Sequence, residues 1–330
     1  MTSPKNTIQL CNRREFLIAS GLVVAGNVLS CGSQPARQTI GKTIVPTTPT
    51  QIRVRIGKNI QQLTIGNKTI SISGVGDSPK TIEIKPNTKI TIGNKTKILS
   101  GIIQLHPKKV AEKDTLDVVA HIPMEQYLPG VLAGELYAHW HQTTFIAQAV
   151  AARSYASAQC LERKNTSYFD VDDGPSSQMF LGQITLDVAH RAVQESSSIV
   201  LTWNNNIIPS YYCACCGGVA ATALDAISPA QIHNVPPLLG REGTDLCKSL
   251  KIHKWSVARP SRTTRKRINR CAKTMNVPEF LNVHTIRSIE PIETNKHGRP
   301  TRLAIYDRRN KATEVKAKDF VRAINTNVSS

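Results

Sequence analysis

The hydrophobic pattern changes once along the chain, and its first part predicts β-structure. From residue 52 to about residue 119, apolar and polar positions alternate, as in residues 52–56 (IRVRI), which is the period of a half-buried strand. The sequence TIGNKT occurs at residues 64–69 and again at 91–96, with Gly-Asn between β-branched residues. Each copy predicts a hairpin turn. Two copies are too few for a solenoid and indicate a local duplication within a small β module.

The pattern becomes helical after residue 122. Residues 124–136 and 143–161 are rich in Ala, Leu, Gln and Glu and predict two helices. Thr143 or Thr144 is expected to cap the second helix, because a threonine hydroxyl accepts a hydrogen bond from a free N–H of the first turn.

The last part of the chain returns to shorter β-segments. Residues 199–212 predict a hairpin that turns at three asparagines, 204–206, and residues 302–306 (RLAIY) predict a strand. Helices between flanking strands predict an α+β fold.

The N-terminus is typical of an export signal. Arg13 and Arg14 precede Phe-Leu and a short apolar run, residues 17–29, which is shorter than the ~20 residues of a membrane-spanning helix. The arginine pair indicates a Tat signal. Residues 28–32 (VLSCG) are similar to a bacterial lipobox, which predicts cleavage before Cys31 and a lipid anchor on it. The alternative is an N-terminal anchor helix that stays attached. The Thr- and Pro-rich residues that follow, up to 51, predict a tether.

The net positive charge of the chain indicates an anionic binding partner. The chain has 42 Lys and Arg against 23 Asp and Glu, a net charge of +19, so its surface attracts anions. In an exported protein these anions are acidic lipids or the carboxylates of peptidoglycan. The basic run at residues 259–270 is either a solvated helix face or such an envelope contact. Binding of nucleic acid rests on net charge alone, because no recognition motif accompanies it, and it is not expected.

Three polar residues in the helical part are candidates for chemistry. Glu135 ends an apolar helical run beside small residues, and a carboxyl group that keeps its proton in such a place can act as a general acid. The alternative is a surface Glu at a helix end. Gln148 and Tyr155 lie on one face of the second predicted helix, where they either line a polar groove or form a hydrogen-bonded core pair.

Four motifs, in order, resemble those of the stage II sporulation protein D (SpoIID/LytB) family over about residues 51–327. They are IPMEQYLPGVLAGE at 122–135, AQAVAARSYA at 147–156, SQMFLG at 177–182 and YCACCGG at 212–218. The resemblance implies a SpoIID-like catalytic core of helices and β-hairpins, with the small β module inserted in it or flanking it. The predicted parts are a Tat-type lipoprotein signal peptide (1–30), a tether (31–51), a β-rich module (52–119), the SpoIID-like core (120–258), and a basic segment with the C-terminal β part of the same fold (259–330).

The resemblance implies a lytic transglycosylase of the bacterial envelope. Such an enzyme cleaves the bond between N-acetylmuramic acid and N-acetylglucosamine and leaves a 1,6-anhydro end, with one carboxyl as acid and then base. That residue falls on Glu135. Six further motif positions are expected to line the glycan cleft: Gln148, Arg153, Tyr155, Ser177, Gln178 and Tyr212.

One departure from the family pattern affects the expected activity. Many members have Lys where this chain has Ile146, which puts turnover in doubt but not the fold or glycan binding. The alternative function is therefore a non-catalytic peptidoglycan-binding protein that recruits or enhances a cell-wall amidase.

The cysteines near the fourth motif suggest a metal. A Cys-x-x-Cys pair with a distant cysteine fits either a zinc site or disulfides. The resemblance implies structural zinc on Cys213, Cys216 and Cys247, with Cys213 replacing a family His, and no cofactor for the chemistry itself. Cys215 or a histidine would be the fourth ligand. Cys160 is expected to be a buried small residue.

Overall fold

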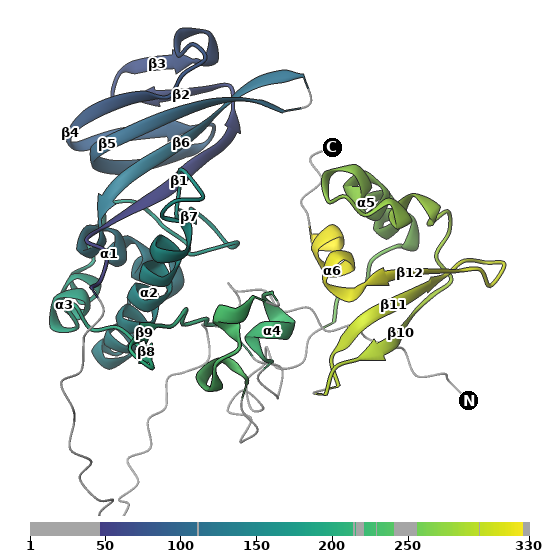
Figure 1. Cartoon of the computed structure of the whole chain (residues 1–330). Helices are drawn as coiled ribbons and strands as arrows, with labels where there is room; N and C mark the ends of the chain where they lie inside the picture. Colours follow the sequence, from purple (N-terminus) through teal and green to yellow (C-terminus); the bar gives the residue numbers. More distant parts are fainter. Residues whose placement is uncertain are drawn as a thin grey trace, which may run out of the picture. The chain divides into compact units, whose positions relative to one another are not determined.

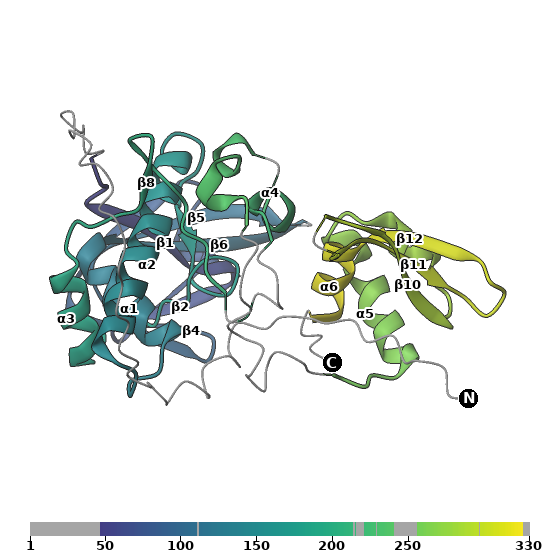
Figure 2. The ribbon, with the colours of Figure 1, turned by 90° about the horizontal axis from the view of Figure 1, so that it is seen from below.

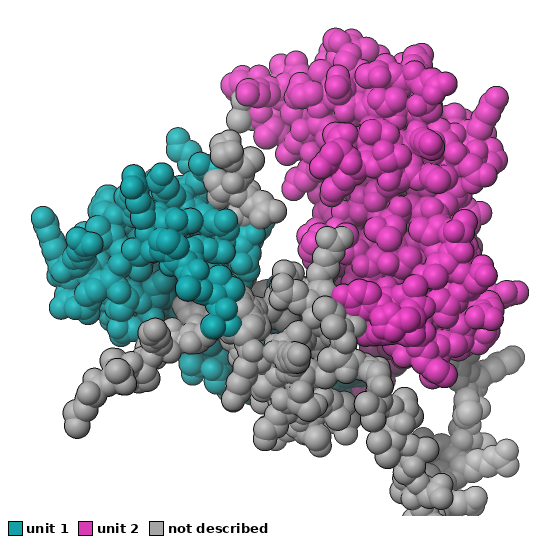
Figure 3. All heavy atoms as spheres, turned by 180° about the vertical axis from the view of Figure 1, so that it is seen from behind, with its two compact units in different colours: residues 1–19, 214–330 teal, residues 20–213 magenta. Residues whose placement is uncertain are grey.

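The computed structural model describes residues 47–110, 112–213, 215, 221–228, 230–240, 256–296 and 298–325 (Figure 1). The predicted signal peptide, Cys31 and most of the predicted tether lie outside these residues. The chain divides into two compact units (Figure 3). The described residues 47–213 are called the N-terminal unit here, and those from 215 to 325 the C-terminal unit.

One seven-stranded sheet forms the upper part of the N-terminal unit in Figure 1, with strand order β3-β2-β4-β5-β6-β1-β7. Neighbouring strands are antiparallel, except for β1 and β7, which are parallel. The strands are β1 (Gln51–Ile60), β2 (Gln62–Ile65), β3 (Lys68–Ser71), β4 (Lys80–Ile92), β5 (Lys95–Val110), β6 (Lys113–Pro123) and β7 (Val171–Asp172), and the short 3-10 helix η2 (Ile72–Gly74) follows β3.

Both duplicated hairpins are confirmed. They are β2–β3 and β4–β5, and each turns at a glycine with positive φ, Gly66 at 59° and Gly93 at 58°. A side chain at such a φ is strained, so the turn favours glycine. The threonine hydroxyls that flank each turn also form a hydrogen bond in both copies, Thr64 with Thr69 at 3.1 Å and Thr91 with Thr96 at 2.9 Å.

The helices of the N-terminal unit follow strands β1 to β6 in the chain. Helix α1 (Met124–Glu135) begins directly after β6, and α2 (Gln142–Arg163), α3 (Asp187–Glu195) and the small hairpin of β8 (Thr202–Trp203) and β9 (Asn206–Ile207) come later. The two predicted helices and this hairpin are confirmed. The predicted cap is wrong: α2 begins one residue early, so the ring of His141 accepts the hydrogen bond, from the N–H of Thr143 at 3.2 Å.

A single hydrophobic cluster joins the sheet to these helices. It includes Ile52 and Ile103 from the strands, Leu128 from α1, Phe145 from α2 and Ala192 from α3. The predicted boundary between residues 119 and 120 falls inside β6. Because strands and helices share this core, the β module and the helices of the N-terminal unit are expected to fold as one body, and the α+β class is confirmed.

The C-terminal unit has its own sheet and its own core. Its antiparallel sheet has the order β10-β11-β12, and β11 contains the predicted strand at 302–306 (Figure 2). Ile268, Phe280, Leu303 and Phe320 are buried in its separate cluster. Its elements are α4 (Ala223–Ala226), η3 (Gln231–His233), η4 (Pro236–Leu238), α5 (Ser261–Thr274), η6 (Pro278–Asn282), β10 (Ser288–Thr294), β11 (Pro300–Tyr306), β12 (Ala312–Lys316) and α6 (Ala317–Asn325). Among the described residues, no helix is both long enough and apolar enough to cross a membrane.

A buried carboxylate ties the sheet of the N-terminal unit to the loop before β7. Asp117 on β6 is fully buried and accepts hydrogen bonds from Arg55, Lys108, the hydroxyl of Tyr168 and the N–H of Asn59, at 2.8–2.9 Å. Burial by itself would raise the pKa of Asp117, but these four donors outweigh it and the pKa is lowered.

Replacing Asp117 by Asn is expected to lower the free energy of unfolding by about 2 kcal/mol at neutral pH, because charged hydrogen bonds are lost. A carboxylate with a lowered pKa in the folded state stabilises above its ordinary pKa and loses that effect as the pH falls through the folded pKa. The difference between the two proteins should therefore shrink below about pH 4. Urea unfolding of the wild type and of Asp117→Asn at a series of pH values measures this difference in free energy of unfolding.

Asp114→Asn is the matched control, since Asp114 is exposed on the same strand. An equal loss in both variants, or a loss for Asp117→Asn that does not change with pH, would contradict this account.

Candidate functional site

Two glycines of α1 bring a distant segment against the helix. A Cβ atom on Gly134 would lie 2.4 Å from the carbonyl oxygen of Met179, and one on Gly130 would lie 2.2 Å from that of Gly182. The N–H of Leu181 also donates to the carbonyl of Gly130 at 3.2 Å. Only glycine leaves room for this approach, so the small residues of the first motif hold the third motif in place.

Glu135 lies where these two segments meet. It is the last residue of α1 and is half-buried, and its Oε1 accepts a hydrogen bond from the N–H of Met179 at 2.8 Å. Its Oε2 receives no hydrogen bond from any described residue. Because the backbone N–H already occupies Oε1, a proton on this carboxyl group would sit on Oε2.

Gln178 connects the helices behind Glu135. Its Oε1 accepts a hydrogen bond from the hydroxyl of Tyr127 at 3.0 Å, and its Nε2 donates to the carbonyl of Ala152 at 3.3 Å and to the hydroxyl of Tyr212 at 3.1 Å. Gln178 is fully buried, and burial raises the pKa of the Tyr127 phenol well above its ordinary value. The network therefore joins α1, α2 and the fourth motif through neutral hydrogen bonds.

Three other predicted cleft residues lie around this network. Tyr155 packs edge-on against Tyr211, with ring centroids 5.8 Å apart. Gln148 is half-buried on the same helix, and its buried Nε2 has no hydrogen-bond partner among the described residues. The hydroxyl of Ser177 accepts a hydrogen bond from the N–H of Asp172 at 3.1 Å and closes the loop before Gln178.

Arg153 on α2 does not take part in the Gln178 network and instead lies between α1, α2 and α3. Its side chain is 1% exposed, and it forms a bidentate pair with Glu125 at 2.8 and 2.9 Å. It also donates to the carbonyls of Val193 at 3.2 Å, Ser196 at 2.8 Å and Ile199 at 3.3 Å, at and just after the end of α3. These contacts favour a role in joining the three helices, and a direct contact with a glycan stays a prediction.

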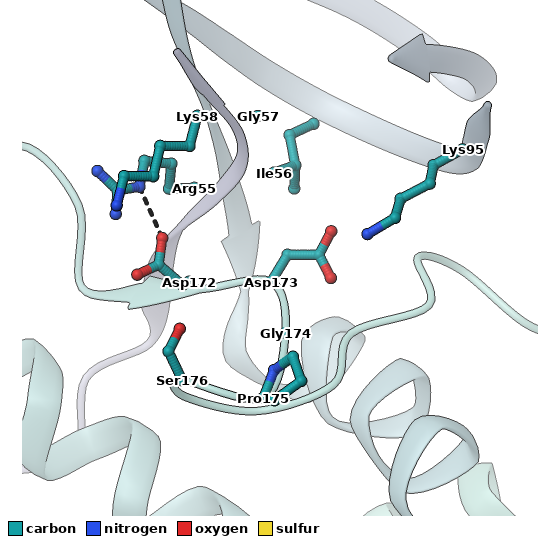
Figure 4. A pocket seen from close by; sticks show the side chains of 10 residues that line it. All are labelled: Arg55, Ile56, Gly57, Lys58, Lys95, Asp172, Asp173, Gly174, Pro175 and Ser176. Atoms are coloured by element: carbon teal, nitrogen blue, oxygen red, sulfur yellow. Dashed lines mark hydrogen bonds and ion pairs between the residues drawn. The ribbon is translucent and has the colours of Figure 1, made fainter. Parts of the chain in front are cut away.

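A polar pocket of about 280 Å³ lies beside the third motif (Figure 4). Its two carboxylates have cationic partners: Asp172 pairs with Arg55 at 2.6 Å, and Asp173 with Lys97 at 3.0 Å. Burial raises the pKa of Asp173, which Lys97 opposes. The pocket is on balance basic, and its lining does not include Glu135. The lining residues are Arg55, Ile56, Gly57, Lys58, Lys95, Asp172, Asp173, Gly174, Pro175 and Ser176.

An aromatic cluster directly follows Glu135, and the sequence patterns above did not single it out. Tyr137 stacks on His139 with ring centroids 5.7 Å apart and packs against Trp140 at 6.2 Å. Aromatic residues make up 5% of the chain, so two of them within four positions were a usable signal. Aromatic rings offer an apolar face with a polar edge, which suits a sugar ring.

The predicted zinc ligands are only partly within the described residues. Cys213 is exposed, whereas Cys216 and Cys247 lie outside the described residues. The described residues contain no group of three His, Cys, Asp or Glu side chains that could hold a metal ion. Cys160 is buried, as expected, and burial raises the pKa of its thiol.

Zinc content tests the ligand set directly. The protein is expected to contain about one zinc ion per chain, and Cys213→Ser is expected to lower that content and the melting temperature together, because a structural zinc site contributes folding free energy. Elemental mass spectrometry of the purified protein measures the zinc content. Cys271→Ser is the control for the zinc content alone, because Cys271 is buried in the core of the C-terminal unit and its replacement lowers the melting temperature by itself. A metal-free wild-type protein would leave disulfides as the explanation.

Gly134→Ala tests whether the close approach serves Glu135. The added Cβ would displace Met179 and lengthen the hydrogen bond to Oε1 of Glu135, so we expect at least a tenfold loss of any Glu135-dependent activity, with a loss of stability of about 1–3 kcal/mol from overpacking. Gly74→Ala is the control, because no atom lies within 4 Å of that position and its φ is not in the left-handed region. Unchanged activity in Gly134→Ala would mean that this hydrogen bond does not position the carboxyl group.

Comparison with known proteins supports the resemblance over the first three of the four motifs. Residues 112–203 match the family model SpoIID, described as stage II sporulation protein, and this range contains Glu135 and all the predicted cleft residues except Tyr212. The chain is also 31% identical, over 146 residues, to an uncharacterized protein of Brachyspira hyodysenteriae. That similarity covers 44% of this chain and 38% of the relative's length. The chain therefore carries, at residues 112–203, a segment that matches the SpoIID family model.

Proposed function

We propose that this protein is a lytic transglycosylase that cleaves peptidoglycan glycan strands, with Glu135 as its general acid and base. A SpoIID domain points to a function related to the cell wall. The observation that carries the finer proposal is the carboxyl group of Glu135, held at the end of α1 by the N–H of Met179 and open at Oε2.

The proposed reaction uses this carboxyl group twice. Protonated at Oε2, Glu135 gives its proton to the glycosidic oxygen as the bond from that oxygen to C1 of the muramic acid breaks, and the N-acetylglucosamine unit leaves as an alcohol. The resulting carboxylate then takes the proton of the 6-hydroxyl of the same muramic acid. That hydroxyl oxygen forms the new bond to C1, so no water is consumed and no second carboxylate is needed.

The neighbouring residues have supporting roles in this proposal. Gln178 and Tyr212 fix the position of the third motif against α1, and through it the hydrogen bond to Glu135. Gln148 and Tyr155 would contact the glycan from α2, and Tyr137 would pack against a sugar ring. Ser177 shapes the loop that precedes Gln178.

The second candidate function is that of a peptidoglycan-binding protein that enhances an amidase, and Ile146 favours it. Ile146 stands where many family members have Lys, and in this chain it packs against the hydrophobic core of the N-terminal unit. An isoleucine there offers no positive charge to the cleft. If that charge is needed for turnover, glycan binding would survive without cleavage.

The test is analysis of the products that purified protein alone releases from cell walls. Intact sacculi and glycan strands whose stem peptides an amidase has removed are incubated with the protein in parallel. The soluble products are then separated by chromatography and identified by mass spectrometry. Anhydro-muramyl products support the transglycosylase, and a preference for stripped strands would define its substrate. Binding to sacculi without any product would support the amidase-enhancing function, and Ile146→Lys would then be tested for a gain of activity.

The proposed substrate lies outside the cytoplasm, which agrees with the export signal predicted from the sequence. We propose that the protein is held in the bacterial envelope by acylation at Cys31. Mass spectrometry of the protein from its native membrane would detect the acyl chains.

A further inference from the structure

The positive charge of this chain is concentrated in its C-terminal unit. Residues 256–325 contain 17 Lys or Arg and 6 Asp or Glu, a net charge of +11 out of +19 for the whole chain. Eleven of these 17 cations are arginines, and six of the 17 lie on α5, which has no acidic residue. None of these side chains has a role in the reaction proposed above for Glu135.

Helix α5 has two opposite faces. Ile268, Cys271 and Ala272 are buried in the core of the C-terminal unit. Four cations at i, i+4, i+8 and i+11 share the other face, and all are exposed: Arg262, Lys266, Arg270 and Lys273. This set of four is called the α5 cationic face.

Two neighbouring arginines have a different task and help to define this face. Arg259 and Arg267 both donate to the carbonyl oxygen of Ile324 near the end of α6, each at 2.7 Å, and so hold the two helices together. By contrast, Arg262, Lys266 and Lys273 form no hydrogen bond or ion pair with any described residue. The fold therefore leaves these charges in water without needing them for its stability.

We propose that the α5 cationic face docks on a membrane surface rich in anionic phospholipids. Its charges are dense, with four exposed cations along a helix about 21 Å long, and a surface of phosphate headgroups matches that density. Guanidinium groups bind phosphate oxygens in a bidentate way, which fits the arginine content. Because the apolar side of α5 is occupied by the core, the helix binds headgroups without inserting into the acyl chains.

The test is co-sedimentation of the full chain with lipid vesicles. The protein carries Cys31→Ser, so that no acyl chain contributes to binding. Vesicles contain equal parts of phosphatidylglycerol and phosphatidylcholine, or phosphatidylcholine alone. We expect binding to the anionic vesicles only, and a strong decrease of binding between about 0.1 and 0.5 M salt, because the contact is electrostatic.

Two triple variants distinguish the contribution of the α5 cationic face to vesicle binding from that of the overall net charge. Arg262→Gln, Lys266→Gln and Lys273→Gln together are expected to weaken vesicle binding by about tenfold or more. Lys80→Gln, Lys85→Gln and Lys89→Gln remove the same charge from exposed positions of β4 and are expected to change it less than twofold. Circular dichroism verifies that both variants are folded.

Three results would overturn the proposal. They are absence of binding to anionic vesicles, an equal loss in both triple variants, and tight binding to a DNA duplex without binding to vesicles. None of these experiments involves glycan cleavage, so their outcome is independent of the function proposed for Glu135.

Discussion

Replacing Glu135 by Gln is expected to reduce the rate of glycan-strand cleavage by about 10³-fold, within the range of general acid–base catalysis, without unfolding the protein. The amide oxygen of Gln can still accept the hydrogen bond from Met179, so the local structure is kept. The amide neither donates a proton to the glycosidic oxygen nor takes one from the 6-hydroxyl. Initial rates on stripped glycan strands measure the effect.

The control is Glu83→Gln, which removes the same charge from an exposed position on β4. It should leave the rate within about twofold, and both variants should melt as the wild type does. Cleavage by Glu135→Gln at more than about a tenth of the wild-type rate would assign the chemistry to another group.

Replacing Arg153 by Met is expected to lower the free energy of unfolding by about 3–5 kcal/mol, because several buried carbonyl groups lose their hydrogen-bond donor, at about 1–3 kcal/mol each. The partner Glu125 is exposed, so water can solvate its carboxylate in the variant. The variant loses the pair with Glu125 and leaves the carbonyls of Val193, Ser196 and Ile199 without their donor. The contact between α1, α2 and α3 should loosen first. Urea unfolding of the purified variant measures the change.

Arg191→Met is the matched control, because it makes the same substitution at an exposed position of α3, where the side chain forms no hydrogen bond or ion pair with a described residue. We expect it to change stability by less than about 0.5 kcal/mol. If Arg153→Met were as stable as the control but bound glycan poorly, Arg153 would be a substrate-binding residue, as the motif resemblance implied.

The sequence predicted the local elements of the fold well, because period and turn chemistry act over a few residues. Both TIGNKT hairpins, the first two helices, the hairpin at 199–212 and the strand at 302–306 are present. The cap of α2 was missed because a histidine ring replaced the expected threonine hydroxyl. The shared core of sheet and helices was also missed, since it depends on contacts between distant segments.

The candidate site was predicted in part, for a similar physical reason. Motif order identified Glu135 and Gln178, but only the structure places Met179 against Gly134 and joins Gln178 to Tyr127. These pairs are more than 40 residues apart, so no local pattern could reveal them. Arginine is usually exposed, which made a buried structural role for Arg153 hard to anticipate.

The central claim, that Glu135 catalyses cleavage without water, is tested most directly in water enriched in ¹⁸O. Wild-type protein and Glu135→Gln are each incubated with stripped glycan strands, and mass spectrometry measures the mass of the new muramyl ends. The account predicts anhydro ends that contain no ¹⁸O, produced by the wild type only. Reducing ends that carry ¹⁸O, or equal amounts of product from both proteins, would contradict it.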